Sequence, residues 1–208
     1  MKKLCFIAVL LLAISCNEDQ PLKKESLVDS FLKSSAFTDL KISLTELEVS
    51  NAQITEVDLD TKSILIPLKG NLKYVISRVH LLSGQPSKFK SAFTFEYVTN
   101  LNYEQLSESL KNKDYTGKFE VRSNQDDSFL FTITNGKFES IDSKINKSSR
   151  LNNCSGSVGS NAWIQDVASC AAGRMDDLNT LFWLGCMADV VRCWGSNVVS
   201  CIIDGCIQ

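Results

Sequence analysis

The sequence has little of what most catalytic and metal sites need. Its 208 residues include one histidine, three prolines and ten glycines. No cysteine occurs between residues 17 and 153, and no lysine between residues 151 and 208. Walker-type loops, dinucleotide fingerprints, EF-hands and HExxH motifs are all missing, and a net charge of -2 provides no positive field for nucleic acid. We therefore predict a protein that is not an enzyme, binds no nucleic acid and needs no metal or cofactor.

The apolar run near the N-terminus is too short to cross a membrane. Leu4–Ile14 has about eleven residues, whereas a membrane-spanning helix needs about 20. Lys2 and Lys3 precede this run and Ser15-Cys16 follow it, which is the order of a cleaved secretory signal. Residues 1–16 are thus expected to direct export and to be removed up to the cysteine.

The end of this signal, Ala13-Ile14-Ser15-Cys16, resembles the lipobox of bacterial lipoproteins. The resemblance implies that Cys16 carries acyl chains such as palmitate and anchors the mature protein in the outer membrane. The following Asn17-Glu18-Asp19 is similar to Bacteroidota-type lipoproteins and implies display at the cell surface. Residues 17–24 would then be a tether. The alternative is an ordinary signal peptide with an incidental cysteine.

Eight cysteines are present, but Cys5 leaves with the signal and Cys16 would carry lipid. The other six cluster near the C-terminus: Cys154, Cys170, Cys186, Cys193, Cys201 and Cys206. An even, clustered set in an exported chain predicts three disulfides, for which 15 pairings are possible. Zinc is disfavoured, because the segment has neither close cysteine pairs nor a histidine.

Residues 25–141 are predicted to fold as an α+β domain. Apolar residues recur at helical steps up to residue 46, which indicates two short N-terminal helices. Alternating residues and short polar spacers then predict five or six strands in an antiparallel β-meander. Asn135-Gly136 predicts a tight hairpin before the last strand.

Residues 142–153 have the polar composition of a linker, and residues 154–208 are expected to form a small all-α, disulfide-rich C-terminal domain. Asn161 would begin one helix, Asp176 and Asp177 a second that reaches Trp194, and Ser196 or Asn197 a third.

Two further features were weighed for function. His80 lies within a predicted strand and is expected to be an ordinary strand residue. Four aromatic residues gather in the tail and could be core of a small domain or an exposed interaction face. They are Trp163, Phe182, Trp183 and Trp194.

The six tail cysteines, the small and apolar residues between them and the weak acidity resemble halocin-type bacteriocin precursors. That resemblance implies an antimicrobial C-terminal peptide, secreted after a cut at Lys147 or Arg150, that acts on a target-cell membrane or a surface receptor. The alternative is a cell-surface lipoprotein whose tail stays attached as a protein- or glycan-binding module.

Overall fold

The computed structural model describes residues 24–57, 59–70, 72–81, 88–144, 161–176, 186 and 189–206. The helices are α2 (Lys24–Leu32), α3 (Ser35–Thr38), α4 (Tyr103–Lys111), α5 (Asn161–Asp176) and α7 (Val190–Cys206), with 3₁₀ turns η1 (Leu44–Glu46) and η2 (Val49–Asn51). The strands are β1 (Gln53–Glu56), β2 (Thr61–Pro67), β3 (Lys73–His80), β4 (Lys88–Val98), β5 (Gly117–Ser123), β6 (Ser128–Thr134) and β7 (Lys137–Lys144).

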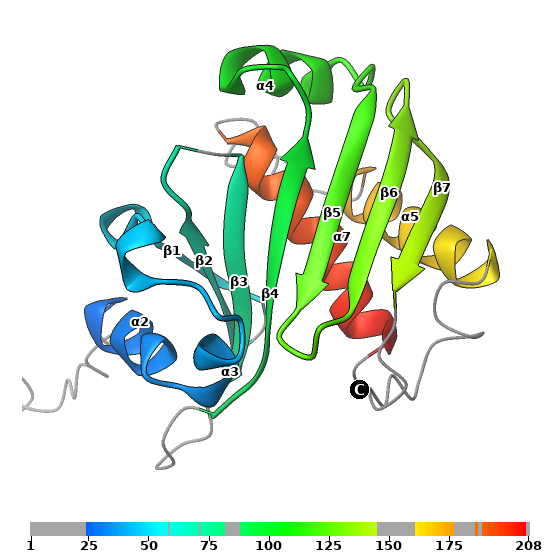
Figure 1. Ribbon diagram of the computed structural model, residues 1–208. Coiled ribbons are helices and arrows are strands. Elements are labelled where there is room, and N and C mark those ends of the chain that lie inside the picture. Colours follow the sequence, from blue (N-terminus) through cyan, green and yellow to red (C-terminus); the bar gives the residue numbers. More distant parts are fainter. Residues whose placement is uncertain are drawn as a thin grey trace, which may run out of the picture.

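The seven strands form one sheet in the order of the sequence, and every neighbouring pair is antiparallel (Figure 1). This confirms the predicted meander and the mixed α+β class. The number of strands exceeds the predicted five or six because the two mostly exposed outer strands, β1 and β7, both pair with a neighbour.

The hairpin between β6 and β7 has the predicted two-residue turn. Asn135 and Gly136 both have positive φ, 49° and 71°, as a turn matched to the strand twist requires. A side chain at Gly136 would overlap the carbonyl of Lys113, so glycine is needed there for space as well as for backbone conformation.

The N-terminal helices cover one face of the sheet, over strands β2 to β4. Phe31 of α2 and Phe37 of α3 pack edge to face with ring centroids 5.6 Å apart. Beneath them the strands contribute apolar residues of their own: Ile64, Ile66, Val75, Val79 and Ala92. None of the described helices covers the continuation of this face over β5 to β7 (Figure 1), and we call it the groove face.

The opposite face of the sheet, the tail-covered face, lies against α5 and α7 (Figure 1). Its strands present alternate aromatic and aliphatic residues, and the helices present Trp163, Val167, Val191, Val198 and Ile202, all within one hydrophobic cluster. Gly195 lets α7 approach β4 closely, because a side chain there would overlap the ring of Phe95. The tail is therefore a second layer on the sheet.

This arrangement does not confirm a separate all-α C-terminal domain. The expectation assumed that the tail helices bury their apolar sides against each other, within disulfides of their own. Instead α5 and α7 share a core with strands β2 to β6. The expected linker, 142–153, also begins too early, because β7 continues to Lys144.

Two helix boundaries differ from the predictions. α7 runs unbroken from Val190 to Cys206, so no helix begins at Ser196 or Asn197. The Asn197 amide lies 3.6 Å from Cys193 Sγ one turn earlier, so this polar residue is accommodated inside the helix. The second expected helix does not begin at Asp176, which ends α5.

α4 was not predicted from the sequence, where its residues were assigned to one of the polar spacers between strands. Asn102 and Gln105 form a capping box at its start, and Leu106 and Leu110 are buried four residues apart. Those two signals are local, and together they would have identified the helix.

Candidate functional site

The structure pairs four of the six tail cysteines. Cys170 of α5 is bonded to Cys201 of α7, and Cys186 is bonded to Cys193. The first bridge joins two helices across 31 residues, and the second closes a loop of seven at the start of α7. Cys154 lies outside the described residues and Cys206 ends α7, and the third bridge stays a prediction.

Two of the predicted interaction aromatics make contacts within the protein. Trp163 is only 1% exposed, and its ring centroid lies 5.2 Å from that of Phe129. Trp194 is half-buried and stacks on Phe138 at 5.7 Å, with Phe119 edge-on at 5.1 Å. These two tryptophans therefore fix the tail to the sheet.

Polar contacts also hold the start of α7. The Tyr97 hydroxyl donates to the Val191 carbonyl at 2.7 Å, inside the core. The Tyr103 hydroxyl donates to the Asp189 carboxylate at 2.5 Å, and Arg192 lies 3.0 Å from the second oxygen of that carboxylate. α7 is thus attached to β4 through Tyr97 and to α4 through Tyr103.

The tyrosines on this side of the sheet stay protonated far into the alkaline range. Burial raises the pKa of Tyr97 well above its ordinary value of 10.0. Burial, and then the hydrogen bond to Asp189, raise the pKa of Tyr103. Burial also raises the pKa of Tyr115 to about 12, and its hydroxyl donates to the Lys118 carbonyl at 3.0 Å. All three can therefore act as hydrogen-bond donors at neutral pH.

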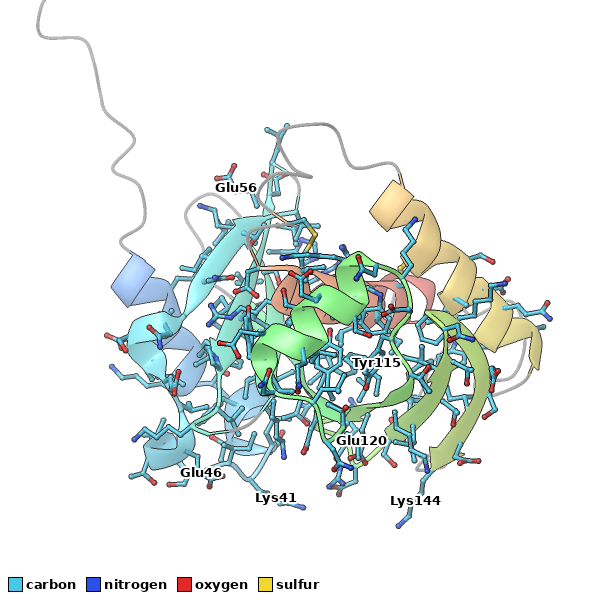
Figure 2. All side chains as sticks on the ribbon, turned by 90° about the horizontal axis from the view of Figure 1, so that it is seen from above. Lys41, Glu46, Glu56, Tyr115, Glu120 and Lys144 are labelled. Carbon is cyan, nitrogen blue, oxygen red and sulfur yellow. A yellow bond between two sulfur atoms is a disulfide. The ribbon has the colours of Figure 1, made fainter. Side chains whose placement is uncertain are left out.

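The groove face carries an open groove of about 980 Å³, between the chain that follows α3 and strands β3 to β7. Figure 2 shows Lys41, Glu120 and Lys144 projecting on the same side of the molecule, away from α5 and α7. Four lining residues are cations (Lys41, Lys73, Arg122 and Lys144) and four are acids (Asp39, Glu120, Asp126 and Asp127). The groove is therefore strongly polar but balanced in charge.

Strand register arranges part of this charge into two rows that run across the strands. Thr94, Arg122, Ser128 and Lys144 are successive cross-strand partners, and we call them the cation row. Two residues along each strand, Glu96, Glu120, Leu130 and Asp142 are also successive partners, and we call them the acid row. Residues opposite each other in adjacent strands share a face, so both rows lie on the groove face.

An ion pair links the two rows within β5. Arg122 Nε and Nη2 donate to the Glu120 carboxylate at 2.8 and 3.1 Å. Hydrogen bonding to Glu120 raises the pKa of Arg122 above its ordinary value. At the end of the acid row, Lys73 lies 3.6 Å from Glu96. These pairs offset the repulsion between Glu96 and Glu120, which are directly opposite each other.

Two of the residues that line the groove have unusual backbone conformations. Lys41 follows α3 with φ 57°, and Asp126 lies in the turn between β5 and β6 with φ 64°. Their side chains are 3.6 Å apart, although both are largely exposed. Left-handed conformations are uncommon outside glycine. Here they occur at the two residues whose opposite charges meet across the groove.

His80 lies in β3, as predicted. Its Nδ1 is 2.8 Å from the Thr61 hydroxyl of the neighbouring strand, an ordinary cross-strand contact. Within the described ranges, no three His, Cys, Asp or Glu side chains are grouped so that they could hold a metal ion. No helix in that part of the chain is long and apolar enough to span a membrane.

Several predicted sites lie outside the described residues: Cys16, Lys147, Arg150, Cys154, Phe182 and Trp183. The lipid anchor and the cleavage positions therefore remain predictions. The groove residues, by contrast, were missed from the sequence. The alternating charges at Lys118, Glu120 and Arg122 are a signal that could have identified an exposed strand face, but only the folded chain brings Lys41 and Lys144 beside it.

Comparison with protein-family models, with curated proteins and with solved structures finds no match to this chain.

Proposed function

We propose that this chain is a non-enzymatic, outer-membrane lipoprotein that works uncut and presents the groove face to a ligand. One observation carries the proposal: the cysteine-rich tail shares its core with one face of the sheet, while the part of the opposite face beside the N-terminal helices carries an open, charged groove. The tail then acts as a structural layer that supports the sheet. This is the attached form of the two alternatives that the sequence left open.

The depth of the tail contacts favours an attached tail. Trp163, Val191, Val198 and Ile202 are at most 1% exposed, and burial of each such side chain contributes about 1.5 to 3 kcal/mol. Separation of the tail would return these groups and their partners on the sheet to water. A peptide released at Lys147 or Arg150 would need a force or a partner that overcomes this cost.

Two features support the proposed location outside the cytoplasm. Disulfides such as Cys170–Cys201 persist in oxidising surroundings outside the cytoplasm. The signal that ends at Cys16 would supply the route and the acyl chains. The groove would then face extracytoplasmic ligands.

Intact-mass analysis of membrane and medium fractions from the native cells tests this proposal. We expect one lipidated chain in the membrane fraction that gains about six mass units on reduction, because three disulfides each take up two hydrogens. Protease treatment of whole cells should remove it from the surface. A soluble fragment of about residues 148–208 in the medium would overturn the proposal.

That fragment would instead support a bacteriocin-like precursor. One observation favours this alternative, namely the distribution of the cysteines. All six remaining cysteines lie in the tail, and both described bridges join tail residues to each other. A cut between β7 and α5 would therefore leave the tail bound to the sheet only by non-covalent contacts. Growth inhibition by the isolated fragment, acting through its apolar helices on a target membrane or receptor, is the decisive assay.

A further inference from the structure

We propose that the groove binds an extended peptide whose side chains on one face alternate between acidic and basic. The inference rests on the proposed function, because it names the ligand class for the groove face. It follows from the order of charge on that face and from the chemistry that the groove does not offer.

The spacing of the two rows matches an extended chain. The cation row and the acid row are two residues apart along each strand, which corresponds to about 6.6 Å. An extended peptide repeats its same-face side chains at the same interval. A peptide that lies along β5 and β6 would place an acidic residue on the cation row and its next same-face residue, a basic one, on the acid row.

The ion pair with Glu120 orients Arg122 and leaves part of its guanidinium accessible to such a ligand. The two bonds to Glu120 use Nε and Nη2 of Arg122, and Nη1 takes part in neither. The Arg122 side chain is 60% exposed and the Glu120 side chain 21%. A ligand carboxylate can therefore meet an Arg122 that is already oriented, with the hydroxyl of Ser128 and the amine of Lys144 beside it in the same row.

Other ligand classes fit less well. None of the described residues that line the groove is aromatic, so these residues offer no stacking platform for nucleotide bases. Its four cations are matched by four acids, so a polyanion would gain no net attraction. A chain that carries both charges in alternation satisfies both rows at once.

Binding is measured by NMR titration of the labelled mature chain, residues 16–208, made soluble by Cys16→Ser. The probe is the capped heptapeptide Thr-Glu-Thr-Lys-Thr-Glu-Thr, compared with versions whose charged positions are all Glu or all Lys. We expect a Kd below about 1 mM for the alternating peptide, amide shifts at Thr94 and Ser128, and binding about fivefold weaker for either single-sign peptide. Equal binding of all three peptides would overturn the inference.

An exchange of charges locates the site. Glu120→Arg with Arg122→Glu keeps the net charge and the pair within β5 but reverses the order of charge along that strand, where the peptide is expected to lie. We expect it to weaken the alternating peptide about fivefold and to favour Thr-Lys-Thr-Glu-Thr-Lys-Thr. The matched control exchanges Glu56 and Lys62, a cross-strand pair 3.6 Å apart outside the groove, and should leave both affinities unchanged. If the first exchange fails to fold, Lys144→Gln should still weaken the alternating peptide.

The failures of the two proposals are distinguishable. If the chain is lipidated, uncut and surface-exposed but its peptide affinities do not change when Glu120 and Arg122 are exchanged, the peptide inference alone is overturned. A tail released into the medium overturns the proposed function whatever the peptides do.

Discussion

The two faces of β5 and β6 are made from alternating residues of the same two segments, yet they differ completely in use. Phe119, Val121 and Phe131 are fully buried against the tail. Between them, Glu120 and Arg122 point to the groove face and form an exposed ion pair. One period-two pattern thus provides a core layer on one side and a charged surface on the other.

This difference separates stability from binding within one sheet. The tail is held on its face of the sheet by aromatic contacts and by the Tyr97 hydrogen bond, and two disulfides join tail residues to each other. The groove face beside it is held by ion pairs at the surface, which contribute little to stability. Substitutions on the first face should therefore lower stability, and substitutions on the second should alter binding.

The largest expected effect is removal of the disulfide between α5 and α7. In the chain-entropy description, a bridge that closes 31 residues is worth about 4 kcal/mol, and one that closes seven about 2 kcal/mol. Cys170→Ala with Cys201→Ala should therefore destabilise the fold more than Cys186→Ala with Cys193→Ala. Chemical denaturation of both double variants measures the difference, and the reverse order would show that the tail layer does not depend on the helix-to-helix bridge.

The second prediction concerns the contact of α7 with β4. Gly195→Ala should lower the free energy of unfolding by about 1 to 3 kcal/mol, because the new methyl group overlaps the Phe95 ring. Gly173→Ala in α5 is the control, since a Cβ there has no atom within 4 Å. Alanine is the better helix former, so this control should stabilise by about 0.5 to 1 kcal/mol. Stabilisation by both substitutions would contradict close packing of α7 on the sheet.

Alkaline pH should lower the free energy of unfolding through a tyrosine on the tail-covered side of the sheet. The pKa of Tyr115 is raised from 10.0 to about 12 in the folded protein. Above pH 10 the unfolded chain therefore loses this proton first, and the stabilisation present at lower pH is lost as the pH rises towards 12. Tyr115→Phe removes a hydrogen bond worth about 1 kcal/mol and should make the alkaline decline shallower. Denaturation at pH 8 and pH 11 tests this, and an unchanged slope would speak against it.

The local parts of the fold could be predicted from the sequence, and the long-range parts could not. The β6–β7 hairpin followed from Asn135-Gly136, because that dipeptide favours positive φ at both positions. The placement of α7 did not follow, because helical spacing shows that one side is apolar without showing what covers it. Six clustered cysteines suggested a tail with a core of its own, whereas Val198 and Ile202 of α7 share a core with the sheet.

The groove illustrates the same limit for function. The alternation of Glu120 and Arg122 was visible in the sequence as a strand pattern. Its role in a charged groove depends on Lys144, two strands away, and on Lys41 in the N-terminal region. Those neighbours are set by register and by tertiary packing, which a single sequence does not report.

The smallest expected effect lies at the ion pair between Lys41 and Asp126 in the groove. Asp126→Asn removes the ion pair with Lys41 but retains a residue type that tolerates the left-handed conformation at this turn. Because both side chains are about three-quarters exposed, the free energy of unfolding should change by no more than about 0.5 kcal/mol. Denaturation at low and high salt measures it. A loss above about 1 kcal/mol would mean that the groove charges hold the fold together, and the division between a stabilising face and a binding face would then fail.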